Sequence, residues 1–300
     1  MKIAVLSGKG GTGKTFVSVN LAFVKGKSAY IDCDVEEPNG RLFFKPQKTL
    51  LEKVNVMVPS VDASKCTGCR KCTGFCKFSA LAYVKDKLLI FPELCHACKG
   101  CVMFCPEQAL SEAGRYIGFI EHGMAGEVEV ITGVLNTGEA TGVPIIRKLL
   151  SNLHLDGTII IDCPPGSACS VMESIKGADY CLMVAESTVF GIHNLDMVYN
   201  LVKLFKKPYA LVVNKVLSGN STKQNCPLCD PADHSLIEKY CMDHGIKIIA
   251  YIPYDAELGL ANSEGLIAAA EYPGYMNLFK GILETVEKEV CYETTGYSER

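Results

Sequence analysis

The sequence lacks the long apolar runs, the excess of one charge and the leader region that would place a chain in a membrane, on nucleic acid or outside the cell. No apolar run approaches the roughly 18 residues that a membrane-spanning helix needs. The formal net charge of −3 provides no basic surface for nucleic acid or anionic lipid. Met1–Leu6 leads directly into a glycine-rich loop and leaves no room for a signal peptide. We therefore expect a cytoplasmic protein that binds neither membrane nor nucleic acid.

Cysteine, in contrast, is abundant. The 300 residues include 16 cysteines, and eight of them fall between Cys66 and Cys105. In a reducing compartment such residues are more often metal ligands or catalytic thiols than disulfides. A disulfide scaffold is the alternative, but a chain that is 48% hydrophobic has enough apolar side chains for an ordinary core. The clustering therefore predicts metal chemistry in the middle of the chain.

The hydrophobic pattern outside this cluster predicts an α/β fold. A short strand at 3–6 ends at glycines, a helix should run from 13 or 14 to about 24, and SAYID (28–32) should form the next strand. Strand, helix and strand in this order make a βαβ unit with parallel strands. Further strands are expected at 128–136, 158–166, 180–187, 209–215 and 246–253, and helices at 143–153 and 276–290. Continuous apolar strands are typical of a mostly parallel sheet with helices on both faces.

An internal duplication interrupts this alternation from about residue 62 to residue 110. The segment CTGCRKCTGFCKFSAL (66–81) matches CHACKGCVMFCPEQAL (95–110) in its cysteine spacing, at an offset of 29 residues. We therefore predict two domains. Residues 1–61 and 111–300 should form the α/β domain, and residues 62–110 should form a small domain inserted into it.

Each half of the duplication carries the spacing C-x₂-C-x₂-C-x₃-C. This is the bacterial ferredoxin pattern, in which the fourth cysteine of a run ligates the cluster of the other run. It predicts two 4Fe–4S clusters in a bacterial-ferredoxin-like α+β domain. One cluster would be held by Cys66, Cys69, Cys72 and Cys105, and the other by Cys95, Cys98, Cys101 and Cys76. Zinc is the alternative, but it normally takes paired C-x₂-C units separated by a longer spacer.

The loop LSGKGGTGKT (6–15) fits two nucleotide-binding patterns. It matches the dinucleotide pattern G-x-G-x-x-G, with Asp32 about 20 residues further on, and also the P-loop pattern. In a P-loop, backbone N–H groups cradle the phosphates, the lysine reaches the β- and γ-phosphates, and the threonine hydroxyl coordinates Mg²⁺. A second acidic residue for the metal should follow another buried strand. Because Lys14, Thr15 and Asp162 have roles only in the P-loop interpretation, the sequence predicts a nucleoside triphosphate and Mg²⁺.

The motif KGGTGKT, with Lys9 ahead of the glycines, resembles the deviant Walker A motif of the MinD/ParA/Mrp family of P-loop ATPases. The resemblance continues through IDCDVEEPN (31–39), IIIDCPPG (159–166), VVNK (212–215) and IPYD (252–255), in the family's order. It covers nearly all of the chain outside the insert. It implies a P-loop NTPase fold and a Mg-dependent ATPase that forms a homodimer on ATP binding, in which Lys9 reaches the phosphates of the other subunit.

The resemblance also implies roles for single residues. Lys9, Lys14 and Asp34 would be catalytic, with Asp34 orienting the attacking water. Mg²⁺ would be held by Thr15, Asp32 and Asp162. The nucleotide contacts would be Gly8, Gly10, Gly11, Thr12, Gly13, Lys14, Thr15, Asp162, Gly166, Asn214, Pro253 and Asp255. Two simpler alternatives stay open, namely that Asp34 only caps a turn and that Asn214 only ends a strand.

A third cysteine motif, NCPLCDPADH (225–234), lies between the last two expected strands. Its C-P-x-C pattern resembles the Mrp-type iron–sulfur carrier ATPases, in which two such motifs hold one 4Fe–4S cluster across a homodimer. Cys226 and Cys229 match that pattern. A zinc site with His234 or Cys241 and a reduced pair without metal are the alternatives.

These features predict an ATP-hydrolysing iron–sulfur protein that couples a nucleotide-driven homodimer to electron transfer, or to cluster delivery, toward a redox or iron–sulfur acceptor protein. The eight-cysteine insert favours electron transfer, whereas Cys226 and Cys229 favour delivery. The alternative is a spatial or regulatory ATPase of the MinD/ParA kind with redox-sensing clusters. That role needs a membrane or DNA surface, and the small net charge and the lack of a basic tail count against it.

Overall fold

The computed structural model describes residues 1–151, 157–217 and 234–296. Its large sheet contains β1 (Lys2–Leu6), β2 (Ser28–Asp32), β3 (Gln47–Val61), β6 (Leu110–Ala125), β7 (Val128–Leu135), β8 (Thr158–Asp162), β9 (Tyr180–Glu186), β10 (Tyr209–Val216) and β11 (Ile248–Pro253). In the described residues the strand order is β11-β10-β9-β1-β8-β2-β7-β6-β3. The strands from β11 to β7 are parallel, and β6 and β3 join one edge antiparallel. The predicted mostly parallel α/β sheet is confirmed.

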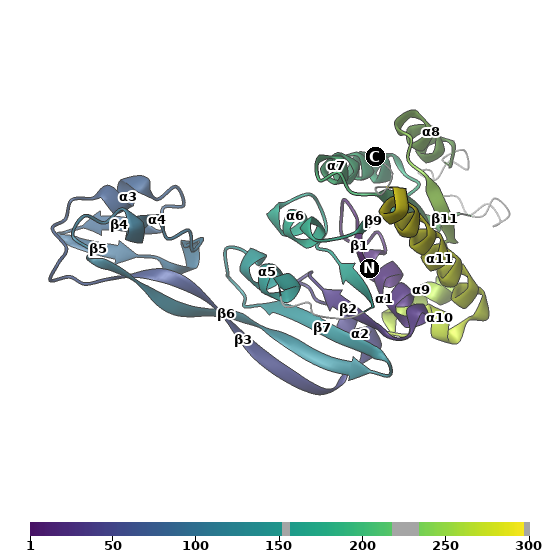
Figure 1. Cartoon of the computed structure of the whole chain (residues 1–300), viewed down its shortest axis with the longest axis horizontal. Coiled ribbons are helices and arrows are strands. Elements are labelled where there is room, and N and C mark those ends of the chain that lie inside the picture. Colours follow the sequence, from purple (N-terminus) through teal and green to yellow (C-terminus); the bar gives the residue numbers. More distant parts are fainter. Residues whose placement is uncertain (152–156, 218–233, 297–300) are drawn as a thin grey trace.

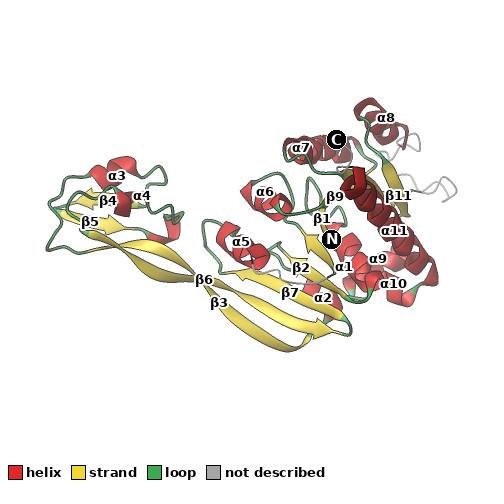
Figure 2. Ribbon diagram, viewed as in Figure 1, coloured by secondary structure: helices red, strands yellow, loops and turns green. Residues whose placement is uncertain are grey.

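Helices cover both faces of this sheet (Figure 2). One face packs under α1 (Lys14–Lys25), α2 (Gly40–Phe44), α9 (Ala256–Ser263), α10 (Ala268–Glu271) and α11 (Pro273–Gly296). The other packs under α5 (Val143–Ser151), α6 (Cys169–Lys176), α7 (Val189–Leu204) and α8 (His234–His244). Side chains of β1 alternate between the two cores, with Ile3 on one side and Ala4 on the other. None of the helices in the described ranges has the length and apolar character needed to cross a membrane.

The first βαβ unit matches its prediction closely. Gly13 precedes α1 in a left-handed conformation with φ 98°, which a residue with a side chain rarely adopts. Gly26, with φ 72°, ends the helix and donates its N–H to the carbonyl of Phe23. The apolar face of α1 then packs on β1 and on α11, where Phe16 meets Phe279 with ring centroids 5.6 Å apart. The glycine loop is therefore fixed between a buried strand and a buried helix.

A long antiparallel ribbon carries the cysteine-rich segment away from the sheet (Figure 1). Strands β3 and β6 pair from Gln47 opposite Met124 to Val61 opposite Leu110. Between them lie α3 (Lys71–Phe75), β4 (Leu81–Val84), β5 (Lys87–Ile90), the 3₁₀ turn η1 (Pro92–Leu94) and α4 (Gly100–Met103). The hydrophobic pattern did not predict this ribbon, because the first seven residues of β3 are exposed and show no alternation.

Candidate functional site

The predicted nucleotide segments meet at the carboxyl ends of the central strands. Asp32 at the end of β2 lies opposite Asp162 at the end of β8, which in turn lies opposite Val5 of β1. Gly166 donates its N–H to the carbonyl of Ser7 at 2.9 Å, so the loop after β8 contacts the glycine loop. Ligands of open parallel α/β sheets bind at this edge. The structure therefore brings together motifs that are up to 160 residues apart in the chain.

Two glycines of the loop are required by their surroundings. A Cβ atom on Gly13 would lie 2.0 Å from Nδ2 of Asn214, and one on Gly8 would lie 2.1 Å from the carbonyl oxygen of Asn194. Gly10 and Gly11, in contrast, have open space at the Cβ position. Gly11 has φ 76°, which favours glycine. Gly8 and Gly13 thus fit packed surroundings, whereas Gly10 and Gly11 leave room for a ligand to approach the backbone.

Lys14 is buried at the centre of the site. Its Nζ donates to Oδ1 of Asp162 at 2.7 Å and lies 3.7 Å from Oδ2 of Asp34. Burial by itself lowers the pKa of Lys14, but the charge and hydrogen bond of Asp162, with the charges of Asp34 and Asp32, hold it above its ordinary value. The ammonium group is therefore permanently charged at neutral pH. Thr15 follows in the first turn of α1 and is half-buried.

Two residues that the motifs did not indicate also bind Asp162. Tyr30 donates its hydroxyl to Oδ2 at 2.8 Å, and Ser18 donates to Oδ1 at 3.1 Å. Tyr30 lies two residues before Asp32 on β2, so both point to the same face of the sheet. Ser18 lies one helical turn after Lys14. Tyr30 and Ser18 could therefore have been named as candidate site residues from their spacing to Asp32 and Lys14.

The site contains more buried negative than positive charge. Asp32 is fully buried and accepts hydrogen bonds from the backbone N–H groups of Asp34 and Gly40. Burial, with the charge of Asp162, raises the pKa of Asp32 well above its usual range. Burial also raises the pKa of Asp34 to about 6, against the opposing charge of Lys14. Carboxylate oxygens are the ligands that a hard divalent cation such as Mg²⁺ prefers, but these three carboxyl groups do not converge on one point in the described residues.

A second charged group lies on the outer side of the glycine loop. Glu186, the last residue of β9, has its Oε2 2.9 Å from Nζ of Lys9 and its Oε1 2.7 Å from Nζ of Lys215. Burial opposes ionisation of Glu186, but the hydrogen bonds from Lys215 and Lys9 hold its pKa below the usual range. Asn214 donates its Nδ2 to the carbonyl of Thr12 at 2.8 Å. Glu186 and Lys215 were not predicted. Both lie at or near the carboxyl ends of buried strands, and this position in the sequence could have indicated them as candidates.

The remaining predicted nucleotide contacts lie further along the same edge. Asp255 caps α9, because its Oδ1 accepts from the backbone N–H groups of Glu257 and Leu258. Pro253 ends β11 and is exposed. Their contact with a nucleotide, like that of Asn214 with adenine, stays a prediction. Cys226 and Cys229 lie outside the described residues.

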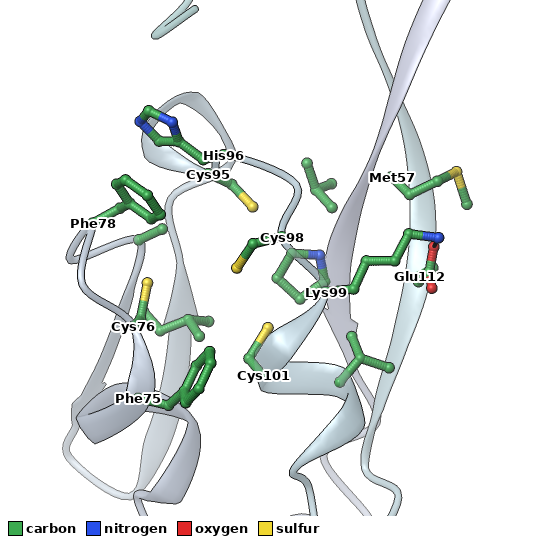
Figure 3. A pocket seen from close by; sticks show the side chains of 15 residues that line it. Met57, Phe75, Cys76, Phe78, Cys95, His96, Cys98, Lys99, Cys101 and Glu112 are labelled. Atoms are coloured by element: carbon green, nitrogen blue, oxygen red, sulfur yellow. Dashed lines mark ion pairs between the residues drawn. The ribbon is translucent and has the colours of Figure 1, made fainter. Parts of the chain in front are cut away.

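The eight clustered cysteines line two separate cavities. One cavity is lined by Cys76, Cys95, Cys98 and Cys101, whose sulfur atoms surround a common space (Figure 3). The other is lined by Cys66, Cys69, Cys72 and Cys105. All eight are free thiols. Within the described ranges, no three His, Cys, Asp or Glu side chains converge closely enough to hold a single metal ion.

The ribbon supports the first of these cavities. Lys99, in the loop between Cys98 and Cys101, forms an ion pair of 2.8 Å with Glu112 of β6 (Figure 3). His96 stacks on Phe78 with ring centroids 3.8 Å apart, which joins the two halves of the duplication. The cavity is therefore built from both cysteine runs and from the strands that lead back to the sheet.

A P-loop at the carboxyl edge of a parallel sheet is the mark of an α/β nucleotide-binding domain. The chain belongs to the family described as the CobQ/CobB/MinD/ParA nucleotide binding domain, which matches residues 3–268. An uncharacterised protein of Methanocaldococcus jannaschii is 31% identical over 251 residues, which cover 80% of this chain and 89% of the relative.

The chain is also similar to one iron–sulfur protein and to one solved ATPase-fold structure. An iron–sulfur cluster carrier protein of Pyrococcus horikoshii is 24% identical over 278 residues, covering 88% of this chain and 78% of that protein. The solved structure of the septum site-determining protein MinD with Mg-ADP from Pyrococcus horikoshii aligns with a TM-score of 0.57 and 18% identity, covering 96% of each chain. At that identity the structure shows a shared fold alone.

Proposed function

We propose that this chain is a Mg-dependent ATPase that carries two 4Fe–4S clusters in residues 62–110 and uses a nucleotide-driven homodimer to control electron transfer to an acceptor protein. Family membership and the geometry of the glycine loop support the nucleotide half of this proposal. The arrangement of the cysteines supports the iron–sulfur half.

In the proposed ATPase, each buried polar group of the nucleotide site has a role. The N–H groups of the glycine loop and the amino end of α1 bind the phosphates. Lys14, which is held by Asp162 in the nucleotide-free protein, turns to the β- and γ-phosphates when they enter. Thr15, Asp32 and Asp162 would hold Mg²⁺, and the charge of the metal would offset the excess of acidic groups described above. Asp34, at the solvent side of Lys14, orients the attacking water.

The single observation that carries the iron–sulfur half is the division of the cysteines between the cavities. Each cavity takes three cysteines from one run and the fourth from the other. This is the exchange of ligands that the bacterial ferredoxin pattern requires. A zinc site would need four sulfurs within about 4 Å of one another, since each Zn–S bond is about 2.3 Å long. Cavities lined by separated thiols fit a polynuclear cluster better than a single ion.

Bound clusters would supply one-electron redox chemistry. The protein's part is to hold the thiolates and to control access. Cys69 and Cys98 are exposed, one in each set, so each predicted cluster lies near the surface. Burial raises the pKa of the Cys101 thiol to about 11, with further contributions from Cys95 and other nearby thiols. That thiol therefore needs the metal's charge to be bound as a thiolate.

Cluster delivery is a second candidate output, and one observation favours it. The Pyrococcus horikoshii relative is named as an iron–sulfur cluster carrier and spans 88% of this chain. If this output holds, Cys226 and Cys229 would bind the transferable cluster between two subunits. The MinD likeness favours no spatial role, because it shows the fold alone.

The test is a count of iron and sulfide on protein purified without oxygen, together with its electronic and EPR spectra. About eight irons per chain, in wild type and in a Cys226→Ala/Cys229→Ala variant, support two clusters in the insert alone. A loss of about two irons per chain in the variant indicates a third, shared cluster. Stoichiometric zinc in place of iron refutes the iron–sulfur half. Mixing the loaded protein with an apo-ferredoxin and ATP separates the outputs, since only delivery moves iron to the acceptor.

A further inference from the structure

Two consecutive peptide groups of the glycine loop are bound by consecutive residues of β10. The carbonyl of Gly11 accepts from Nζ of Lys215 at 2.7 Å. The carbonyl of Thr12 accepts from Nδ2 of Asn214 at 2.8 Å. Both carbonyls therefore point toward β10, although the loop and this strand are about 200 residues apart in the sequence.

The orientation of these carbonyls fixes the direction of two N–H groups. In a planar trans peptide the C=O and the following N–H point in opposite directions. The N–H groups of Thr12 and Gly13 are therefore directed away from β10, toward the inner side of the loop. A phosphate-binding loop needs its N–H groups to converge on that side. Gly11 and Gly13, with φ 76° and 98°, have no side-chain restraint of their own that would hold this arrangement.

Lys215 is itself held in place. Its Nζ is 2.7 Å from Oε1 of Glu186, and its backbone N–H donates to Oδ1 of Asn214 at 2.9 Å. Glu186 and Asn214 lie opposite each other in the register of β9 and β10. Lys215 adopts a left-handed backbone with φ 58°. A lysine tied at both its backbone and its ammonium group loses little further freedom when it binds a third partner, which here is the loop carbonyl.

We propose that Lys215 is a positioning residue of the nucleotide site: held by Glu186, it fixes the Gly11–Thr12 peptide so that the loop is ready to bind phosphate before the nucleotide arrives. This role rests on the proposed nucleotide binding and adds to it a residue that touches no phosphate. Asn214 does the same for the next peptide group, but its buried position makes its own variants harder to interpret. Lys215 is half-exposed at its side chain, so it can be replaced without opening a cavity.

The affinity for Mg·ADP, measured by calorimetry, tests the proposal. Lys215→Ala is expected to weaken Mg·ADP binding about tenfold, since a charge-assisted hydrogen bond to the loop is lost. Lys206→Ala is the matched control, because Lys206 is also an exposed lysine with a left-handed backbone, at φ 51°, and it lies away from the loop. Lys215→Arg keeps a donor and should restore the affinity to within about threefold of wild type.

A purely electrostatic role for Lys215 predicts a different result for Glu186. The comparison is between Lys9→Ala and Lys9→Ala/Glu186→Ala, so that the release of Lys9 from Glu186 does not contribute to the difference in Mg·ADP affinity. If Lys215 acts only by its charge, Glu186→Ala removes a negative group near the phosphates and strengthens Mg·ADP binding. If Lys215 must be held in position, the same substitution weakens binding. The sign of the change therefore decides between the two, and stronger binding overturns the proposal.

A measurement without nucleotide separates this inference from the proposed function. The NMR order parameters of the Thr12 and Gly13 amides should fall from about 0.85 toward 0.6 in Lys215→Ala and stay unchanged in Lys206→Ala. If wild type binds no Mg·ADP but these amides loosen in Lys215→Ala, the proposed function fails, and only the finding that Lys215 holds the glycine loop in place stands. If wild type binds Mg·ADP and Lys215→Ala alters neither affinity nor order parameters, the positioning role is wrong.

Discussion

The ammonium group of Lys9 lies 2.9 Å from Oε2 of Glu186 in the same chain. Lys9 is therefore occupied within its own subunit, whereas the resemblance to MinD/ParA ATPases assigns it to the phosphates of a partner subunit. The side chain of Lys9 is 40% exposed, so the ion pair is accessible to water and easily broken. Entry of a triphosphate would offer Lys9 a stronger negative partner.

Lys9→Ala is expected to weaken ATP-dependent dimer formation while leaving the fold intact. The lost ion pair should change the free energy of unfolding by less than about 1 kcal/mol, as is usual for exposed pairs. The dimer should weaken at least tenfold, roughly 1.4 kcal/mol or more. Light scattering after size exclusion, with a non-hydrolysable ATP analogue, measures it. Lys27→Ala, an exposed lysine between α1 and β2, is the control. Normal dimer formation by Lys9→Ala would show that Lys9 stays within its own subunit.

The buried carboxyl of Asp34 predicts a particular dependence of stability on pH in the nucleotide-free protein. Burial raises its pKa from 3.8 to about 6, so the folded protein binds this proton more tightly than the unfolded chain does. Its contribution to stability is therefore present below about pH 4 and is lost as the pH rises to about 6. Asp34→Asn removes this loss and should stabilise the protein at pH 7 by about 2–3 kcal/mol.

Urea unfolding followed by circular dichroism measures this effect, because the chain contains no tryptophan for fluorescence. The difference between Asp34→Asn and wild type should grow between pH 4 and 6 and then level off. Glu36→Gln is the control, since Glu36 is exposed and lies in the same turn. A difference that does not vary with pH would show that the Asp34 carboxyl is not strained by burial.

The sequence predicted those parts of the fold and the site that depend on local pattern. The apolar runs at β1, β2 and β8 and the glycines at 8–13 identify the sheet centre and its loop, because burial on both faces demands continuous apolar residues. The outer ribbon was missed, since the first seven residues of β3 are exposed and carry no apolar alternation. Tyr30 and Lys215 lie near the ends of predicted strands, and this position could have marked them as candidates. Their partners could not be predicted, because these depend on which strands are neighbours and local spacing does not determine strand order.

Gly13→Ala should destabilise the protein and disrupt its nucleotide loop. The new Cβ would lie 2.0 Å from Nδ2 of Asn214, so the side chain that binds the Thr12 carbonyl must move. The left-handed φ of 98° adds backbone strain. Together these effects should lower the free energy of unfolding by about 2–4 kcal/mol. Gly177→Ala is the control, because a Cβ there meets nothing within 4 Å and φ is −96°. An equal effect of the two substitutions would contradict the packing described for the loop.

Pairs of cysteine substitutions test how the ligands divide between the two cavities. Cys105 belongs to the second run in the sequence but lines the cavity of Cys66, Cys69 and Cys72. Cys66→Ser/Cys105→Ser should therefore damage one site only and leave about four irons per chain. Cys101→Ser/Cys105→Ser should damage both sites and leave almost none.

Each pair removes two thiols, so the number of lost ligands is matched and only their distribution differs. If each run instead supplied all four ligands of its own cluster, the results would be exchanged: the pair from the second run would keep four irons and the mixed pair would lose all. Circular dichroism of both variants should show that the large sheet persists, because the cysteine-rich segment lies at the far end of the β3–β6 ribbon (Figure 1). The iron counts then report the ligand sets rather than the stability of the whole chain.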